Sequence, residues 1–285
     1  MPEVTLPQGT VRYRELGPPD GPVVLFVHGF LVNGSLWDET ADALAARGYR
    51  TLQPDLPLGS HKVALEPDAD LSPRGVARLL AAFAEAVGAS DATLVGNDTG
   101  GALCQFLLDT DASRIGRVVL TNCDGLTTFP PKPFGLILGA ARHPGLFRVA
   151  MLPTRIAAVR HSPLAFGLLV NRRLDPAKSA DWVEPYLSDA GVRRDAAKLC
   201  RAVKPADLAD VATRLRGFDG PALLCWAPKD RFFTIDLGRR IAACFADARM
   251  VEIADSATFV PHDQPLRLAD EIAAFAPVPA AAATS

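Results

Sequence analysis

The stretch that decides the fold of this chain is "TLVGNDTGGAL", residues 93–103. Residues 93–96 carry small and apolar side chains and predict a buried β-strand, and a glycine-rich turn follows them before a helical stretch begins. Asp98 stands at the apex of this strand–turn–helix. The surrounding residues fit the pattern G-x-Nuc-x-G, in which small side chains permit a strained turn that lifts the central side chain above the sheet.

Asp98 has two interpretations. The helix that begins near Thr99 points its N-terminus at the carboxylate, which stabilises negative charge and favours a reacting group. Alternatively, Asp98 only caps the helix, because aspartate is among the commonest N-cap residues. The context favours a reacting group, because the segment "FVHGF" at residues 26–30 follows a buried strand. A backbone N–H is needed there to complete an oxyanion hole.

Strands and helices alternate along most of the chain. Apolar runs and alternating patterns predict strands at residues 11–16, 23–27, 93–96 and 118–121 and within 49–54, 221–230 and 248–255. Helical spacing of apolar residues predicts helices within 35–48, 72–88, 234–246 and 264–276 and directly after Asp98. This alternation predicts the α/β class, with a mostly parallel sheet covered by helices on both faces.

The strand rhythm stops between residues 125 and 216, where nine prolines separate helical segments. We therefore predict an α/β core formed by residues 1–124 and 217–276, with a helical cap at 125–216 inserted after the sixth strand. The tail at 277–285, "PVPAAAATS", is predicted to be disordered.

Composition limits the classes of function. The chain has 285 residues, a formal net charge of -2 and no basic tract, so we expect no nucleic-acid partner. Its longest lipophilic stretch, "FGLILGAA", is too short to span a bilayer, and we expect no membrane partner. The N-terminus lacks the pattern of a secretory signal, and five scattered cysteines suggest neither a disulfide framework nor zinc, so a cytoplasmic protein is expected. No cofactor or metal motif is visible, and the sequence leaves the oligomeric state open.

Several motifs together resemble the α/β-hydrolase superfamily. The resemblance covers nearly the whole chain: "HGF" after an early strand, the elbow "GNDTGG", the inserted cap, "APKDRFF" after a later strand, and the loop before the last helix. An aspartate at the elbow looks like the haloalkane dehalogenase and epoxide hydrolase branch. In that branch the carboxylate attacks a carbon atom, and water then hydrolyses the alkyl ester. The resemblance implies a small-molecule substrate.

The resemblance assigns roles residue by residue. It implies that Asp98 is the nucleophile and that Phe30 and Thr99 supply backbone N–H groups to the oxyanion hole. Asp230, at the end of the seventh strand, would be the acid that orients a base. Asp124, just after the sixth strand, is a second possible acid site, although we interpret it as a turn residue before Gly125.

The chain departs from the family pattern at the base. The family places a histidine in the loop before the last helix, and the matching stretch "ADSATFVPHDQP" puts Thr258 in that slot. His262 follows four residues later and is interpreted as a surface residue, unless the loop turns it inward. Dehalogenase halide ligands are also missing, because Phe30 and Thr99 occupy their positions.

Three hypotheses follow from these residues. The first is a hydrolase that acts on a small, fairly apolar substrate through Asp98. The second is a non-hydrolytic enzyme of the same fold that uses Asp98 as a general acid or base. The third is a ligand-binding protein with a vestigial site. The missing histidine matters to all three, because an ester on Asp98 would not be hydrolysed efficiently without a base.

Overall fold

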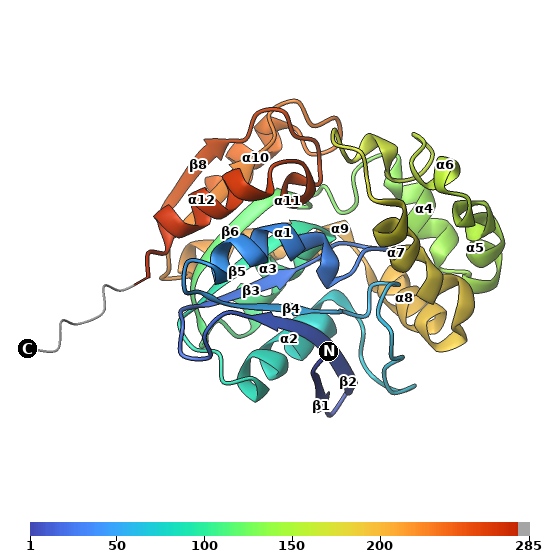
Figure 1. Cartoon of the computed structure of the whole chain (residues 1–285), viewed down its shortest axis with the longest axis horizontal. Coiled ribbons are helices and arrows are strands. Elements are labelled where there is room, and N and C mark those ends of the chain that lie inside the picture. The colour runs from blue at the N-terminus through green and yellow to red at the C-terminus, as the bar shows by residue number, and fades with distance from the viewer. Residues whose placement is uncertain (279–285) are drawn as a thin grey trace, which may run out of the picture.

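A computed structural model describes residues 1–278 of the chain. Its centre is an eight-stranded sheet in the order β1-β2-β4-β3-β5-β6-β7-β8. The two pairings β1–β2 and β2–β4 are antiparallel and the others are parallel (Figure 1). The strands are β1 (Glu3–Leu6), β2 (Gly9–Leu16), β3 (Val23–Val27), β4 (Arg50–Pro54), β5 (Ala92–Asp98), β6 (Ile115–Cys123), β7 (Ala222–Trp226) and β8 (Ala248–Glu252).

The two central strands carry the elbow. β5 lies between β3 and β6, and Val24 pairs with Thr93 in the register of the β3–β5 ladder. All five residues of β3 are buried, and so are the first six residues of β5. Strands that are covered on both faces have continuous apolar sequences, which is why these two could be predicted from the sequence. The predicted α/β class, with its mostly parallel sheet, is confirmed.

Helices cover both faces of the sheet and bury two apolar clusters. One cluster includes side chains of α2 (Pro73–Ala86), α3 (Thr99–Thr110), α9 (Pro205–Ala212) and α10 (Ile235–Ala242). The other includes side chains of α1 (Asp38–Ala45) and α12 (Pro265–Phe275), beside which lies the short helix α11 (Val260–Asp263). A sheet that is apolar on both faces requires this double cover.

The chain between β6 and β7 consists largely of helices. Its helices are α4 (Phe134–Ala141), α5 (Pro144–Met151), α6 (Ala157–Arg160), α7 (Pro176–Ser188) and α8 (Ala190–Ala202). They gather at one end of the molecule, beyond the carboxyl edge of the parallel strands (Figure 1). The last helix before β7, α9, falls inside the predicted range 125–216 but packs against α3. The predicted tail lies outside the described residues from position 279 onward.

Trp182 of α7 fixes these helices to the core. Its indole N–H donates a hydrogen bond of 2.8 Å to Ser35 Oγ, and its carbonyl accepts one of 2.5 Å from Ser60 Oγ. The ring lies edge-on to Phe166 and Phe259, with centroids 5.4 and 6.1 Å away, and is fully buried. Aromatic pairs of this geometry add to the stabilisation from burial. The inserted helices therefore have a defined position above the sheet.

Gly101 provides a test of the tight contact between α3 and β6. A Cβ at this position would lie 2.3 Å from Cys123 Cβ and 2.5 Å from its Sγ. We expect Gly101→Ala to lower the free energy of unfolding by about 1–3 kcal/mol, as overpacking does in other cores, measured by urea unfolding. Gly139→Ala is the control, because no described atom lies within 4 Å of a Cβ built there. Alanine in α4 should stabilise by up to about 1 kcal/mol. Equal stabilities for the two variants would contradict the prediction.

Candidate active site

The elbow at Asp98 has the strained backbone that the sequence predicts. Asp98 ends β5 with φ 54° and ψ −132°, and α3 begins at the next residue. A positive φ is costly for a residue with a side chain and persists only where packing imposes it. The neighbouring glycines make this possible, because a Cβ on Gly100 would lie 2.2 Å from the Val27 carbonyl oxygen. Asp98 makes no side-chain capping bond to α3, so the N-cap interpretation is not supported.

The carboxyl group of Asp98 lies against the loop after β3. A Cβ on Gly29 would lie 2.3 Å from Asp98 Oδ2, so only glycine leaves room there. Desolvation by the surrounding protein raises the pKa of Asp98 to about 7, and the charge of Asp230 adds to the rise. The backbone N–H groups of Thr99 and Phe30 oppose the rise by favouring the charged form. These two N–H groups are the predicted oxyanion-hole donors.

Asp98 lies at the floor of a cavity of about 320 Å3 beneath the inserted helices. Its walls come mainly from α4, α5 and the loops around α6. Polar side chains contribute little, since only Asp98, Thr99 and Thr154 among the lining residues carry polar atoms. The apolar lining residues are Phe30, Leu31, Pro130, Pro131, Phe134, Ile137, Leu138, Phe147, Ala150, Met151, Pro153, Val159, Leu164, Ala165, Phe166, Leu169 and Val183. An apolar cavity with few convergent polar groups is the usual form of a small-molecule site.

Asp230 follows β7 and is bound by three donors. Thr258 Oγ1 donates a hydrogen bond of 2.9 Å to Asp230 Oδ2. The backbone N–H groups of Phe232 and Phe233 donate to Oδ1 over 2.7 and 3.2 Å. Burial raises the pKa of Asp230, and these hydrogen bonds limit the rise. The Thr258 hydroxyl thus contacts the acid at the place where the family pattern expects a histidine.

The backbone of Thr258 also ties this loop to the elbow. Its carbonyl accepts a hydrogen bond of 2.7 Å from Asn97 Nδ2, and Asn97 directly precedes Asp98. The same amide nitrogen donates to Thr121 Oγ1 over 2.8 Å. Thr258 is fully buried, so its side chain has a fixed environment. The loop before α12 therefore lies beside the elbow, although it contributes no side chain to the cavity lining.

Asp124 lies next to the elbow as an orphaned carboxyl group. It is 1% exposed, and neither carboxyl oxygen has a partner in normal hydrogen-bond geometry among the described residues. Its backbone N–H donates to the Asp98 carbonyl over 3.4 Å. Burial raises the pKa of Asp124 well above its usual value, the charge of Asp98 adds to the rise, and the Thr99 side chain opposes it. The interpretation of Asp124 as a turn residue does not predict this depth of burial.

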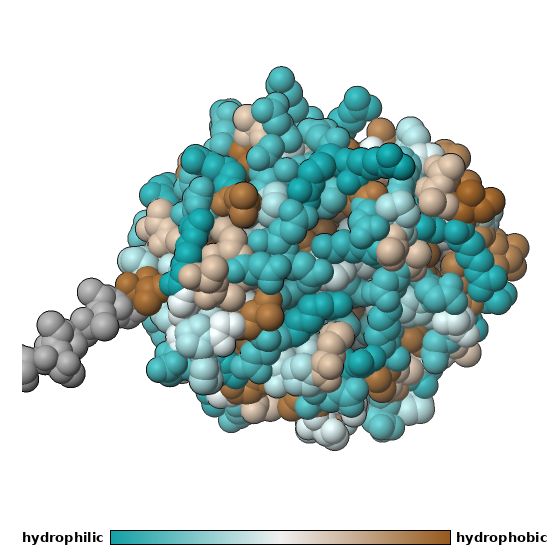
Figure 2. Space-filling model, viewed as in Figure 1, coloured by the Kyte–Doolittle hydropathy of each residue, from teal (hydrophilic) through white to brown (hydrophobic). Residues whose placement is uncertain are grey.

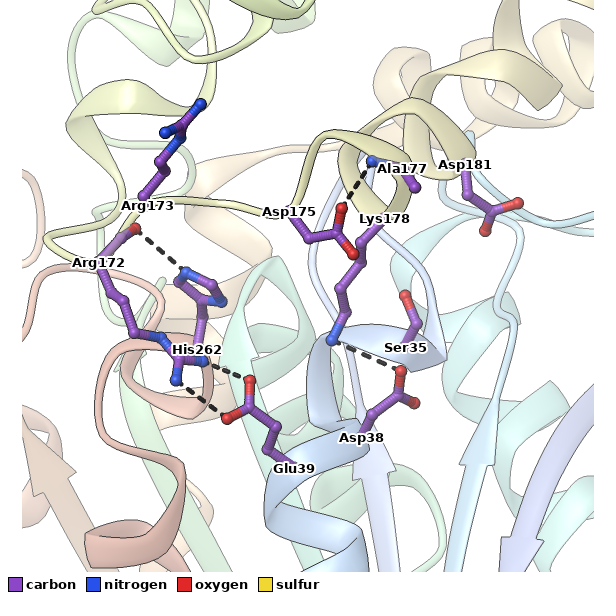
Figure 3. A pocket seen from close by; sticks show the side chains of 10 residues that line it. All are labelled: Ser35, Asp38, Glu39, Arg172, Arg173, Asp175, Ala177, Lys178, Asp181 and His262. Carbon is purple, nitrogen blue, oxygen red and sulfur yellow. Dashed lines mark hydrogen bonds and ion pairs between the residues drawn. The ribbon is translucent and has the colours of Figure 1, made fainter.

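The structure does not bring His262 to Asp98. His262 is 5% exposed, so its interpretation as a surface residue is wrong. Its Nε2 lies 3.2 Å from the Arg172 carbonyl oxygen, and its ring borders a separate hollow of about 700 Å3 between α1 and α7 (Figure 3). Charged side chains dominate that hollow. The Arg172 guanidinium pairs with Glu39, and the Lys178 ammonium lies 3.5 Å from Asp38 (Figure 3).

The other four histidines, all within the described residues, are also absent from the cavity lining. His28 is buried between the Gly29 carbonyl and the Leu56 N–H, and burial lowers its pKa to about 3. His61 Nε2 lies 3.2 Å from Asp195 Oδ2, and His161 Nε2 lies 2.9 Å from Ser179 Oγ. His143 precedes α5 and is exposed. A histidine base is therefore missing from the described part of this site.

Three further features of the described residues concern metal-ligating groups, thiols and apolar helices. The described residues contain no group of three or more side chains suited to a metal ion. The five cysteines are free thiols, and four of them are buried. Within the described chain, no helix is long and apolar enough to cross a bilayer.

The raised pKa of Asp98 predicts how its substitution changes stability. Between about pH 4 and pH 7 the folded protein keeps a proton that the unfolded chain releases, so this carboxyl group destabilises the fold increasingly as pH rises. Asp98→Asn cannot ionise. Its midpoint of thermal unfolding should exceed that of the parent chain by about 5 °C at pH 8 and by less at pH 4. Asp219→Asn, on an exposed turn, controls for the loss of one surface charge. A gain that does not grow with pH would refute the burial effect.

The bond between Thr258 and Asp230 can be tested by removing the hydroxyl. Thr258→Val keeps the volume but leaves a buried carboxyl group with one donor fewer, which should cost about 1–3 kcal/mol in the free energy of unfolding. Thr258→Ser keeps the donor and loses only a methyl group, which should cost about 0.8 kcal/mol. Urea unfolding compares the two variants. A valine variant as stable as the serine variant would show that the bond contributes nothing.

Comparisons with known proteins agree with this architecture. A family model described as alpha/beta hydrolase fold matches residues 22–265. A 2-hydroxy-6-oxononadienedioate/2-hydroxy-6-oxononatrienedioate hydrolase of Dechloromonas aromatica is 26% identical over 240 residues, which cover 81% of this chain and 78% of that protein. A 2-hydroxy-6-oxo-6-phenylhexa-2,4-dienoate hydrolase of Burkholderia cepacia is 26% identical over 241 residues, covering 81% and 79%.

Solved structures share the same fold. An alpha/beta hydrolase fold protein from Burkholderia ambifaria superposes with a TM-score of 0.78 at 20% identity, covering 95% of this chain and 96% of that one. The haloalkane dehalogenase DbeA from Bradyrhizobium elkani USDA94 superposes with a TM-score of 0.75 at 20% identity, covering 95% and 96%. The family model spans most of the chain. The chain therefore belongs to the alpha/beta hydrolase fold family.

Proposed function

We propose that this protein is a hydrolase of a small, largely apolar substrate and that Asp98 is its nucleophile. The observation that carries the proposal is the position of the Asp98 carboxyl group. It lies on a strained turn at the floor of an apolar cavity, where the backbone N–H groups of Phe30 and Thr99 favour its charged form.

The effect of those N–H groups on Asp98 favours its use as a nucleophile. Oxyanion-hole donors are aimed at the atom on which negative charge develops. Here the backbone N–H groups of Phe30 and Thr99 lower the pKa of Asp98, so they favour negative charge on its carboxyl group. If water attacks an ester formed on Asp98, negative charge develops on a carboxyl oxygen of that residue. The two donors then stabilise the tetrahedral intermediate, which is centred on Asp98 Cγ.

The proposed reaction has two steps. In the first, an Asp98 carboxylate oxygen forms a bond to an electrophilic carbon of the substrate, and the bond from that carbon to its leaving group breaks with the electron pair. In the second, water adds to Asp98 Cγ, the ester C–O bond on the carbonyl side breaks, and the alcohol leaves. One oxygen atom of water remains in Asp98. The cavity lining suits a substrate whose bulk is apolar.

The relatives support hydrolysis as the class of reaction. The two curated relatives named above are hydrolases of 2-hydroxy-6-oxo-dienoate compounds. The substrates in their names are carboxylates, whereas the cavity lining of this chain contains no cationic side chain among the described residues. We therefore propose a less polar substrate for this protein.

A second candidate function rests on the environment of Thr258. Thr258 binds Asp230 in place of a histidine, so no base is in position to activate water. With a pKa of about 7, Asp98 is both an acceptable proton acceptor and an acceptable donor near neutral pH. This favours a non-hydrolytic reaction in which Asp98 moves a proton and forms no ester. The third candidate is a ligand-binding protein with a vestigial site, and the experiment must distinguish it from the two enzymes.

The test is mass spectrometry of the Asp98 peptide after turnover in water enriched in heavy oxygen, with a panel of activated esters, haloalkanes and epoxides. We expect heavy oxygen in Asp98 and a fast first release of product followed by slow turnover, because ester hydrolysis lacks a histidine. Asp98→Asn should release no product. Thr258→His should accelerate the slow phase by about tenfold or more, since a general base typically contributes that much or more.

Other results would redirect the assignment. A persistent adduct on Asp98 would support attack without hydrolysis. Neither label nor adduct, together with solvent deuterium entering the substrate in the parent chain and not in Asp98→Asn, would support the proton-transfer function. Tight binding of panel compounds without turnover or exchange would support a ligand-binding protein. Thr258→Ser, which keeps the hydroxyl, controls for disturbance of the loop and should leave the slow phase unchanged.

A further inference from the structure

The inserted helices carry an unusual distribution of charge. Residues 125–174 contain seven of the 30 Lys and Arg residues of the chain and none of its 32 Asp and Glu residues. This stretch therefore has a net charge of +7, which leaves 23 basic against 32 acidic residues, or -9, in the rest of the chain. Arg160 is buried and Arg172 pairs with Glu39, so the other five cations of this carboxylate-free segment provide its positively charged surface.

The same stretch exposes large apolar side chains. Of the nine exposed large hydrophobic residues in the described part of the chain, five lie here. Leu164 is 88% exposed and Leu136 is 81% exposed, the two highest values. The others are Leu146, Val149 and Ile156. Brown side chains gather at the end of the molecule formed by α5 and α6 (Figure 2). We refer to the five residues as the apolar face.

The helices that bear this face are apolar on two sides. In α5, Phe147 and Met151 are buried toward the cavity, whereas Leu146 and Val149 point outward. In α4, every residue is apolar or glycine, and Leu136 points outward. A surface helix normally has a polar outer side, so an apolar outer side indicates a partner or a membrane surface.

Cationic side chains accompany the apolar face. Lys132, Arg142 and Arg155 are exposed, and Arg148 is half-buried in α5. Among the described residues, no carboxylate lies within ion-pair distance of Lys132, Arg142 or Arg148, and Arg155 has only Glu184 at 4.0 Å. Arg142 and Arg148 donate hydrogen bonds to the carbonyl groups of Cys200 and Leu187. Lys132 and Arg155 are therefore the cations best placed to meet an external anion. Apolar side chains together with these cations match a surface that offers hydrocarbon and negative charge. An anionic lipid bilayer has both properties.

The apolar face adjoins the entrance of the cavity above Asp98. Leu164 belongs to the apolar face at 88% exposure, and its side chain also lines the cavity. Val159 and Pro153, which flank the exposed Ile156 in the chain, line the cavity as well. A molecule dissolved in a lipid layer that covered this face would therefore lie next to the cavity without crossing water.

We propose that residues 125–174 dock the protein peripherally on an anionic lipid membrane. The apolar face enters the headgroup region, and Lys132 and Arg155 contact the lipid phosphates. No helix need span the bilayer, so the expectation of no membrane partner, which rested on the lack of a spanning segment, does not apply to this mode of binding. A second copy of the chain suits the face less well, because its +7 stretch would meet another +7 stretch. The docking surface does not depend on the reaction at Asp98.

Vesicle co-sedimentation of the full chain tests the proposal. We expect binding to vesicles of phosphatidylcholine with about one-third phosphatidylglycerol, weak binding to phosphatidylcholine alone, and loss of binding as salt rises. Leu136→Ser with Leu146→Ser should weaken binding about tenfold. Lys132→Glu with Arg155→Glu should weaken it about tenfold or more, because each cation near such a surface contributes about 1 kcal/mol.

The matched control variants change exposed residues of the α/β core, outside residues 125–174. Leu266→Ser removes a leucine that is 63% exposed on α12, and Arg240→Glu with Arg249→Glu reverses two exposed charges on α10 and β8. Both should bind vesicles like the parent chain. The proposal is overturned by absent binding to anionic vesicles, by binding that the Leu136 and Leu146 substitutions leave unchanged, or by a dimer in sedimentation velocity that these substitutions dissociate. The last result would assign the face to a second copy.

Discussion

The close approach of three backbone segments around Asp98 is the constraint on which the rest of the site depends. The loop after β3, the end of β5 and the first turn of α3 meet with no space for side chains at Gly29 or Gly100. Asp98 is held there at a φ of 54°. This geometry stores strain and fixes the carboxyl group between two backbone donors. A carboxyl group on a relaxed turn would reach neither the donors nor the cavity.

Three carboxyl groups, those of Asp98, Asp124 and Asp230, dominate the electrostatics around the elbow. The charge of Asp230 raises the pKa of Asp98, and the charge of Asp98 raises the pKa of Asp124. Burial raises the pKa of all three carboxyl groups. Like charges in a poorly solvated region oppose each other's ionisation. Thr258 and two backbone N–H groups stabilise the charged form of Asp230. Among the described residues, the Asp124 carboxyl oxygens have no comparable hydrogen-bond partners, and burial raises the pKa of Asp124 well above its usual value.

The helices between β6 and β7 are rich in apolar residues, and this composition has two consequences. Their inward side chains form an apolar cavity above Asp98, and their outward side chains leave leucine, valine and isoleucine on the surface among cations. Trp182 fixes α7 to the core, so the position of α7 above the sheet is set by packing and two hydrogen bonds. The segment therefore serves both as the roof of a site and as the contact surface that we propose for lipid.

The sequence by itself determined the fold class and placed Asp98 at the apex of a glycine-rich turn after a buried strand. These features come from local patterns, namely apolar runs and glycine spacing. The resemblance to a known family, rather than any local pattern, singled out Asp230 and Thr258. Only the tertiary structure decided the depth of Asp124, the distance of His262 from the cavity and the packing of α9 against α3. Burial and long-range contacts depend on how distant segments pack, and no local pattern encodes them. The hydrogen bond between Thr258 and Asp230 needed both sources of information. The family resemblance pointed to the two residues, and only the packing of distant segments brings their oxygen atoms to 2.9 Å.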